Sequence, residues 1–282
     1  FNRRNRSGEI VDNQAIVIDL ASGEINDIQW LFADKALLAG TAGGEFAISE
    51  LSNGDPLAPG NIQARLQSRH GVRNILPVAD SGDALFLQNS GKILREIAFD
   101  FASDGYATRN MSVIAEHLLK GGITQMAFAK EPYAIVWMVR SDGKLIGLTW
   151  NNEQKVFAWH QHALGGTNAV VESVTSIPYD GRDQVWLSVR RTVNGATVRY
   201  VEYMELEYQD GDALTTQFYV DSGLTYSGAS TKNISGLDHL EGEDVVVLAN
   251  GAPSRVSYTV NSGAITLQDN ATHAVIGLGY ES

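Results

Sequence analysis

The chain repeatedly places two short apolar runs on either side of a glycine-containing turn, which is the pattern of a β-hairpin. Four such hairpins can be recognised, with turn glycines at positions 44, 91, 143 and 195. Successive glycines are therefore about 50 residues apart, a spacing typical of the four-stranded blades of a β-propeller. The strands expected in the hairpins are 36–39 with 45–48, 84–87 with 92–95, 134–139 with 144–148, and 185–189 with 196–200.

The third repeat has the clearest pattern of a complete blade. Its strands are predicted at 123–128, 134–140, 144–151 and 156–162. Each blade of a propeller buries one face against its neighbour, so a single blade is not stable alone. The sequence therefore predicts a β-propeller of at least four blade-like units over residues 1–206, and residues 10–20 could supply a strand that closes the ring. A meandering β-sandwich with coincidental spacing is the alternative.

One amphipathic segment interrupts the β pattern and predicts a short helix. Asn110 stands at an N-cap position, and Gly121 stands where a left-handed residue would end the helix. The helical stripe of apolar positions consists of Met111, Ile114, Ala115, Leu118 and Leu119. We expect this helix to pack across a connection between two blades.

The composition changes after residue 206, where the acidic, turn-rich segment 207–212 begins. Beyond it the pattern predicts short strands separated by turns at Asn250-Gly251 and Ser262-Gly263. These strands are 217–220, 244–248, 255–260, 264–267 and 274–278. Residues 207–282 are therefore expected to form a separate small β-sandwich or β-barrel domain, so that the whole chain is all-β.

Composition excludes several classes of function. The chain has 282 residues, 44% of them hydrophobic and 19% charged, which is typical of a globular protein. Its net charge of −12 argues against wrapping nucleic acid, since phosphate binding depends on clustered Lys and Arg. The absence of cysteine excludes disulfides and thiolate ligands. No apolar run is long enough to predict a membrane span. From where the sequence starts and stops, we expect it to be a fragment of a longer protein.

Candidate chemistry is sparse. The sequence has no P-loop, no G-x-S-x-G nucleophile motif and no H-E-x-x-H zinc motif, so no catalytic residue and no cofactor is predicted. His160 and His162 are a weak candidate pair of metal ligands, because residues i and i+2 of a strand share a face. No third ligand is indicated, and a pair of surface or interface histidines is the favoured interpretation. The clusters 80–83, 180–183 and 210–212 combine Asp with Gly, and we interpret them as turns and not as calcium sites.

Several segments together resemble a known family. These are residues 40–46, 85–101, 115–118 with 121–123, 148–151 through 159–160, and 235–242. They are similar to the tail nozzle, or tail tubular protein B, of short-tailed bacteriophages and to related prophage tail proteins. The resemblance covers roughly residues 27–282 and corresponds to a middle portion of the family's longer proteins. It implies a six-fold ring below the portal and adaptor, a lumen through which DNA leaves the capsid, and a β-propeller on the outer side.

The expected function is therefore that of a non-enzymatic virion structural protein in a phage tail. Its partners would be further copies of itself and other tail proteins, with DNA passing through the ring without specific binding. The alternative is a tail module that binds carbohydrate on the host envelope, which predicts exposed aromatic side chains beside Asp or Asn in one groove. A propeller hydrolase is a third hypothesis and predicts two acids about 5–10 Å apart in a cleft.

Overall fold

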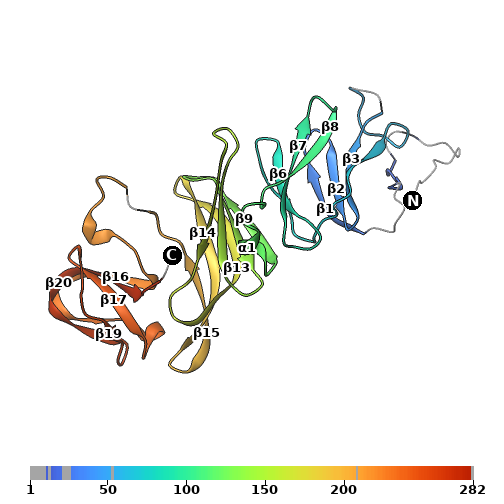
Figure 1. The fold of residues 1–282 in the computed structure, drawn as a ribbon. Coiled ribbons are helices and arrows are strands. Elements are labelled where there is room, and N and C mark those ends of the chain that lie inside the picture. Colours follow the sequence, from blue (N-terminus) through green and yellow to red (C-terminus); the bar gives the residue numbers. More distant parts are fainter. Residues whose placement is uncertain (1–10, 12–13, 21–26, 52–53, 208, 281–282) are drawn as a thin grey trace. The chain divides into compact units, whose positions relative to one another are not determined.

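The structure is a computed structural model that describes residue 11 and residues 14–20, 27–51, 54–207 and 209–280 (Figure 1). The chain forms two compact units, Phe1–Met126 and Ala127–Ser282, and each is described by itself. The prediction of an all-β chain is confirmed, because the described residues form mainly antiparallel strands and a single short α-helix, α1 (Glu116–Leu119). No helix in the described part of the chain is long and apolar enough to cross a membrane.

The first unit contains two four-stranded antiparallel sheets whose strands pair in chain order. The first sheet consists of β1 (Ile28–Ala33), β2 (Leu37–Thr41), β3 (Gly44–Ser49) and β4 (Gln63–Ser68), and the second of β5 (Val78–Asp80), β6 (Asp83–Leu87), β7 (Leu94–Asp100) and β8 (Gly105–Asn110). The hairpins β2–β3 and β6–β7 confirm the first two predicted hairpins. Apolar side chains of both sheets, among them Trp30 of β1 and Phe86 of β6, share one buried core.

A third four-stranded sheet follows, and the boundary between the two units falls inside its first strand. The sheet consists of β9 (Ile123–Ala129), β10 (Ile135–Arg140), β11 (Leu145–Asn151) and β12 (Val156–His162). These bounds agree with the predicted third repeat to within one residue at each strand end. The agreement follows from the Asp142-Gly143 turn, in which Gly143 has a φ of 84° that a glycine adopts without strain.

The fourth sheet has three strands, β13 (Thr167–Tyr179), β14 (Arg182–Val193) and β15 (Ala196–Tyr203), again in chain order. Asn194 and Gly195 connect β14 to β15, with φ values of 47° and 75°. Two successive positive φ angles define the type I′ turn, for which Asn-Gly is the preferred sequence. The fourth predicted hairpin is thereby confirmed, although its sheet lacks a fourth strand.

The four sheets form a series of consecutive meanders, and no sheet formed by the described strands closes into a ring (Figure 1). Val11 and residues 14–20 belong to no strand, and the other positions of the predicted closing strand 10–20 lie outside the described residues. The expectation that this segment forms a strand is therefore wrong for the positions that the structure describes. None of the described strands pairs with it, so its backbone has no ladder to join.

The helix is shorter than its apolar stripe predicts. It covers only Glu116–Leu119, begins after Ala115 and leaves the Ile114 side chain 80% exposed. Asn110 instead ends β8, and its side-chain oxygen accepts hydrogen bonds from the backbone amide and the hydroxyl of Ser112. This local turn competes with helix formation over residues 111–114. The residue with positive φ that follows the helix is Gly122, not Gly121.

The C-terminal part of the second unit is a further antiparallel sheet, in the order β16-β20-β17-β18, with β19 also paired to β17. Its elements are the 3₁₀ turns η1 (Leu214–Thr216) and η2 (Asp238–Leu240) and the strands β16 (Asp221–Ser235), β17 (Asp244–Ala249), β18 (Ala252–Pro253), β19 (Tyr258–Thr259) and β20 (Ala264–Leu278). The turns at Asn250-Gly251 and Ser262-Gly263 are confirmed, since all four residues have positive φ. A separate core of side chains from residues 234–278 holds this sheet together.

The strand predictions in this region are correct only in part. Residues 264–267 and 274–278 are in β conformation as predicted, but they belong to one strand, β20, and residues 217–220 form no strand. Of the predicted strand 255–260, only Tyr258–Thr259 is in β conformation. Strand β16 was not predicted, because its largely exposed residues show no apolar periodicity. The boundary predicted at residue 206 falls inside the second compact unit, where it stays a prediction.

Candidate functional site

The described part of the second unit contains a groove of about 960 Å³. One wall consists of eight consecutive residues, Tyr200–Glu207, which are the end of β15 and the segment after it. The opposite wall includes residues 218–223, which lead into β16. His162 of β12, His239 and Tyr280 complete much of the lining. The groove therefore runs beside the last strand of the fourth meander, and we call it the β15 groove.

The β15 groove combines exposed aromatic rings with carboxylates. Tyr203, Tyr219 and Tyr280 are 50%, 55% and 43% exposed, so their rings are accessible to a ligand. Four acidic residues line the same groove: Glu202, Glu205, Glu207 and Asp221. Aromatic faces stack on the apolar faces of ligands, while carboxylates accept hydrogen bonds from hydroxyl or amide groups. The groove was not predicted from the sequence, although Tyr and Glu recur through residues 200–207 and are a signal of such a site.

A buried arginine fixes the inner wall of the groove. The Arg191 side chain on β14 has no exposed surface. Its Nη1 and Nη2 both bond to the Glu202 carboxylate, the second at 3.1 Å, and its Nε donates to the backbone oxygen of Gly165 at 2.8 Å. Glu202 is paired with Leu187 in the β14–β15 ladder. Two residues further along, Tyr200 is paired with Val189, so Glu202 and Tyr200 lie on the same face of the sheet. The inner carboxylate of the groove is therefore neutralised and held in one position.

The opposite wall is anchored by Asp221. Its Oδ2 accepts a hydrogen bond of 2.6 Å from the Gly165 amide. Burial raises the pKa of Asp221, and the Gly165 amide and the nearby Arg191 act in the opposite direction. Gly165 thus links the two sides, because its carbonyl binds Arg191 and its amide binds Asp221.

Tyr200 and His239 form a second link across the groove. The Tyr200 hydroxyl donates to the backbone oxygen of His239 at 2.8 Å, and burial raises the pKa of this tyrosine. The His239 Nε2 lies 2.9 Å from the backbone oxygen of Ser222, within hydrogen-bonding distance. The floor of the groove is consequently preorganised, while its exposed tyrosines remain free of these bonds.

The predicted histidine pair lies on β12 as expected, with both rings on the same face. His160 Nδ1 and His162 Nε2 share one hydrogen bond of 2.7 Å, and both rings pack against Trp137. Burial lowers the pKa of His162 to about 4, with a further contribution from His160, and burial also lowers the pKa of His160. No group of three metal-binding side chains occurs among the described residues. The pair forms a packed aromatic cluster with Trp137, in which the two imidazoles satisfy each other.

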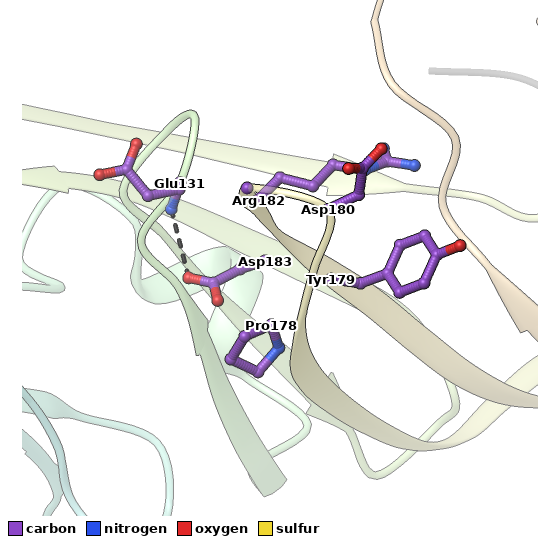
Figure 2. Close-up of a pocket in the computed structure, with 7 residues that line it drawn as sticks. Glu131, Pro178, Tyr179, Asp180, Arg182 and Asp183 are labelled. Atoms are coloured by element: carbon purple, nitrogen blue, oxygen red, sulfur yellow. Dashed lines mark hydrogen bonds between the residues drawn. The ribbon is translucent and has the colours of Figure 1, made fainter.

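A smaller pocket lies at the β13–β14 hairpin, where Glu131 approaches residues 178–183 (Figure 2). The Asp183 Oδ2 accepts hydrogen bonds from the backbone amides of Lys130 at 2.6 Å and Glu131 at 3.2 Å. Asp180 and Gly181 both have positive φ and make the turn. Asp183 therefore holds the loop of Lys130 and Glu131 against the β13–β14 hairpin while it also lines the pocket.

The other two Asp-Gly clusters are also turns, as predicted. Ser81 and Gly82 have positive φ between the paired residues Asp80 and Asp83. In the third cluster the Asp212 carboxylate accepts a hydrogen bond from the Gln209 amide. Backbone geometry thus accounts for the Asp and Gly content of all three clusters.

Comparison with known proteins adds no name to these features. No protein-family model matches the chain, and no curated protein is significantly similar to it. The fold, the β15 groove and the sequence segments described above are therefore the features that bear on function.

Proposed function

We propose that the chain is a non-enzymatic structural protein of a bacteriophage tail, a part of the nozzle through which DNA leaves the capsid. The observation that carries the proposal is the series of four consecutive antiparallel meanders, whose hairpin turns recur about every 50 residues. The resemblance to the nozzle family leads us to expect a β-propeller, whose blades are meanders of this kind. In this proposal they are the blades of a β-propeller on the outer side of the ring.

The charge of the chain supports a conduit. A net charge of −12 disfavours binding to the phosphate backbone, because binding to duplex DNA draws its strength from Lys and Arg that displace counterions. A wall that does not hold the duplex allows it to slide. Arg190, Arg191 and Arg199 of the fourth meander are engaged with carboxylates of the same sheet, Arg191 with Glu202 and the other two with Glu172.

The test is the solution mass of the chain, measured by light scattering after gel filtration and followed by negative-stain images of the peak. We expect a closed ring of about six subunits, because heterologous contacts close into rings when the rotation permits. A monomer that stays monomeric up to high concentration, and that binds carbohydrate, would contradict the nozzle and support the second candidate below.

The second candidate is a module that binds carbohydrate of the host envelope. The observation that favours it is the β15 groove, where the exposed rings of Tyr203 and Tyr219 lie in one lining with carboxylates. A glycan array probed with the chain tests this function. Tyr219→Ala should abolish a signal that arises in the groove, whereas Tyr179→Ala, an equally exposed tyrosine outside the groove lining, should leave it unchanged.

A further inference from the structure

The fourth meander has an unpaired edge where its three predecessors have a strand. The sheets β1–β4, β5–β8 and β9–β12 each contain four strands, whereas the fourth contains only β13, β14 and β15. In the first three sheets the third strand pairs with a fourth, but among the described strands β15 pairs only with β14. An unpaired edge presents a row of backbone donors and acceptors that can pair with another chain.

The register of β15 identifies the residues whose backbone groups face this open edge. Met204 N donates to Val185 O at 2.9 Å, which continues the β14–β15 ladder by one pair. Residues of an antiparallel strand alternate between facing one neighbour and the other. The even-numbered residues of β15 therefore bond to β14, and the N–H and C=O groups of Arg199, Val201 and Tyr203 point outward. Val201 is 74% exposed, and it lines the β15 groove with Tyr203.

The chain also contains a strand-forming segment whose backbone pairs with none of the described strands, although Leu20 at its end packs against the core of the first sheet. Residues 15–20 read Ala-Ile-Val-Ile-Asp-Leu, a sequence rich in the β-branched residues that favour strands. They belong to no strand, and Ile16 and Val17 are 38% and 48% exposed. Six residues in β conformation extend about 20 Å, and the eight residues of β15 about 26 Å, so the segment fits along the edge.

We propose that residues 15–20 of a second copy of the chain add to β15 as the fourth, antiparallel strand of the meander. This inference rests on the proposed ring, because it supplies the contact between neighbouring subunits. The segment of one copy fills the edge of the next. Repeated head to tail, this heterologous contact closes into a ring when the rotation permits, whereas a reciprocal exchange between two copies gives a dimer. The added strand also gives the fourth meander the four strands that the first three meanders have.

Charge and side-chain alternation select the register of this added strand. On the outer face of the sheet, Arg190 and Arg199 share a single carboxylate, that of Glu172, which leaves one positive charge in excess. Placing Asp19 opposite Arg199 neutralises that charge. The same register places Val17 opposite Val201. The backbone N–H and C=O groups of these two residues then point toward each other and can form hydrogen bonds.

The alternate residues of the segment, Ile16 and Ile18, then lie on the inner face of the sheet. That face carries Tyr200 and Glu202 of β15, and it borders the part of the groove lined by Leu187 and Phe218. Three pairs of facing residues exchange six backbone hydrogen bonds. The apolar side chains of the segment are buried on the same side as the groove floor.

Disulfide crosslinking tests the proposal with little background, because the chain contains no cysteine. Val17→Cys and Val201→Cys are made in separate chains, mixed at equal concentration and oxidised. Facing residues of a hydrogen-bonded pair have Cα atoms about 5.5 Å apart, inside the range that a disulfide spans. We expect a crosslinked heterodimer as the main product. Val17→Cys mixed with Tyr179→Cys, whose tyrosine is exposed on β13, should give only background.

A second pair of variants tests assembly without a crosslink. Proline is tolerated in an edge strand when its nitrogen faces away from the sheet, so Val201→Pro should keep the β14–β15 ladder but remove one outward donor. We expect it to lose the oligomer in light scattering while its circular dichroism spectrum is unchanged. Val201→Thr, which keeps the donor and the β-branched shape, should assemble as the unsubstituted chain does.

The outcomes separate this inference from the proposed function. Rings without the Val17–Val201 crosslink in any mixture would overturn the added strand and leave the nozzle standing. Crosslinked chains that form open dimers and no ring would keep the strand and remove the nozzle. A chain carrying both substitutions that crosslinks only within itself would overturn the second copy as the occupant. A strand added along β15 would cover part of the groove lining. Carbohydrate binding that stays unchanged after the crosslink has formed would therefore also contradict the added strand.

Discussion

Replacing Arg191 with methionine tests the central energetic claim about the β15 groove. The Arg191 side chain is fully buried, and it satisfies the Glu202 carboxylate and the Gly165 carbonyl at once. Removing one partner of a buried ion pair leaves the other uncompensated and typically costs about 3–5 kcal/mol. Because the Glu202 side chain is still 18% exposed, water partly solvates the orphaned carboxylate. We therefore expect Arg191→Met to lower the free energy of unfolding by about 3 kcal/mol.

The assay is urea unfolding of the full chain, followed by circular dichroism and tryptophan fluorescence. With a denaturant slope of about 2 kcal/mol/M, the loss should move the unfolding midpoint of the second unit down by about 1.5 M. Arg199→Met is the matched control, because Arg199 makes a comparable pair with Glu172 at the surface and should shift the midpoint little.

A double variant separates the buried charge from simple loss of packing. Arg191→Met with Glu202→Leu removes both charges, and replacing a whole buried ion pair with apolar side chains is often neutral. We expect the double variant to recover most of the lost stability. The reasoning is refuted if Arg191→Met shifts the midpoint no more than Arg199→Met does, or if the double variant is no more stable than the single one.

Three further predictions concern packing, pH and loop anchoring in the second unit. An ideal Cβ at Gly147 would lie 1.9 Å from the His160 ring, so Gly147→Ala should lower the free energy of unfolding in urea by about 1–3 kcal/mol. Gly60→Ala is the control, because a Cβ there would meet no atom within 4 Å and should leave the free energy of unfolding unchanged. The pKa of His162 is about 4 in the folded chain, against 6.5 for an unperturbed histidine, so the fold favours the neutral ring and its stability is complete above pH 6.5. A shift of this size corresponds to about 3 kcal/mol, and because solvent partly screens the incompletely buried ring we expect about 2 kcal/mol to be lost as the pH falls towards 4. His162→Phe should flatten that dependence, and an NMR titration giving a His162 pKa near 6.5 would contradict the cause. Asp183→Ala removes the acceptor of two backbone amides and should cost about 1 kcal/mol, with Asp183→Asn intermediate; equal melting temperatures for all three chains would count against its anchoring role.

The hairpins could be predicted from sequence because their determinants are local. Asn194-Gly195 and Asp142-Gly143 prescribe turns in which glycine takes a positive φ, and the apolar residues on either side alternate or form buried runs. The third sheet was predicted almost to the residue for this reason. The turn chemistry of the three Asp-Gly clusters was likewise readable, since Asp and Gly act on the backbone beside them.

The predictions that failed depended on hydrogen-bond partners that a residue pattern does not specify. The apolar stripe of residues 111–119 favours a helix, but Asn110 bonds to Ser112 and holds the first turn in another conformation. Strand β16 is mostly exposed and carries no apolar alternation, yet it forms because β20 pairs with it over most of its length. Residues 264–278 contain polar positions in the middle that resemble a break, and pairing with both β16 and β17 keeps them in one strand.

The β15 groove likewise combines residues that can be read from the sequence with an arrangement that depends on distant parts of the chain. The sequence contains the Tyr and Glu residues of 200–207, but their arrangement as one wall of a hollow requires residues 218–223 and Tyr280 on the other side. Burial of Arg191 beside Glu202 follows from the β14–β15 register and from the position of Gly165, neither of which a residue pattern specifies.

By itself the sequence determined the all-β class, the positions of four hairpins and their spacing, because turn chemistry and alternation act over a few residues. Only the tertiary structure decided that the fourth meander ends with an open edge at β15 and that a groove lies beside it. The physical reason is that a strand exists only when another strand satisfies its backbone, and the partner is chosen by packing and hydrogen bonding across long separations in the chain.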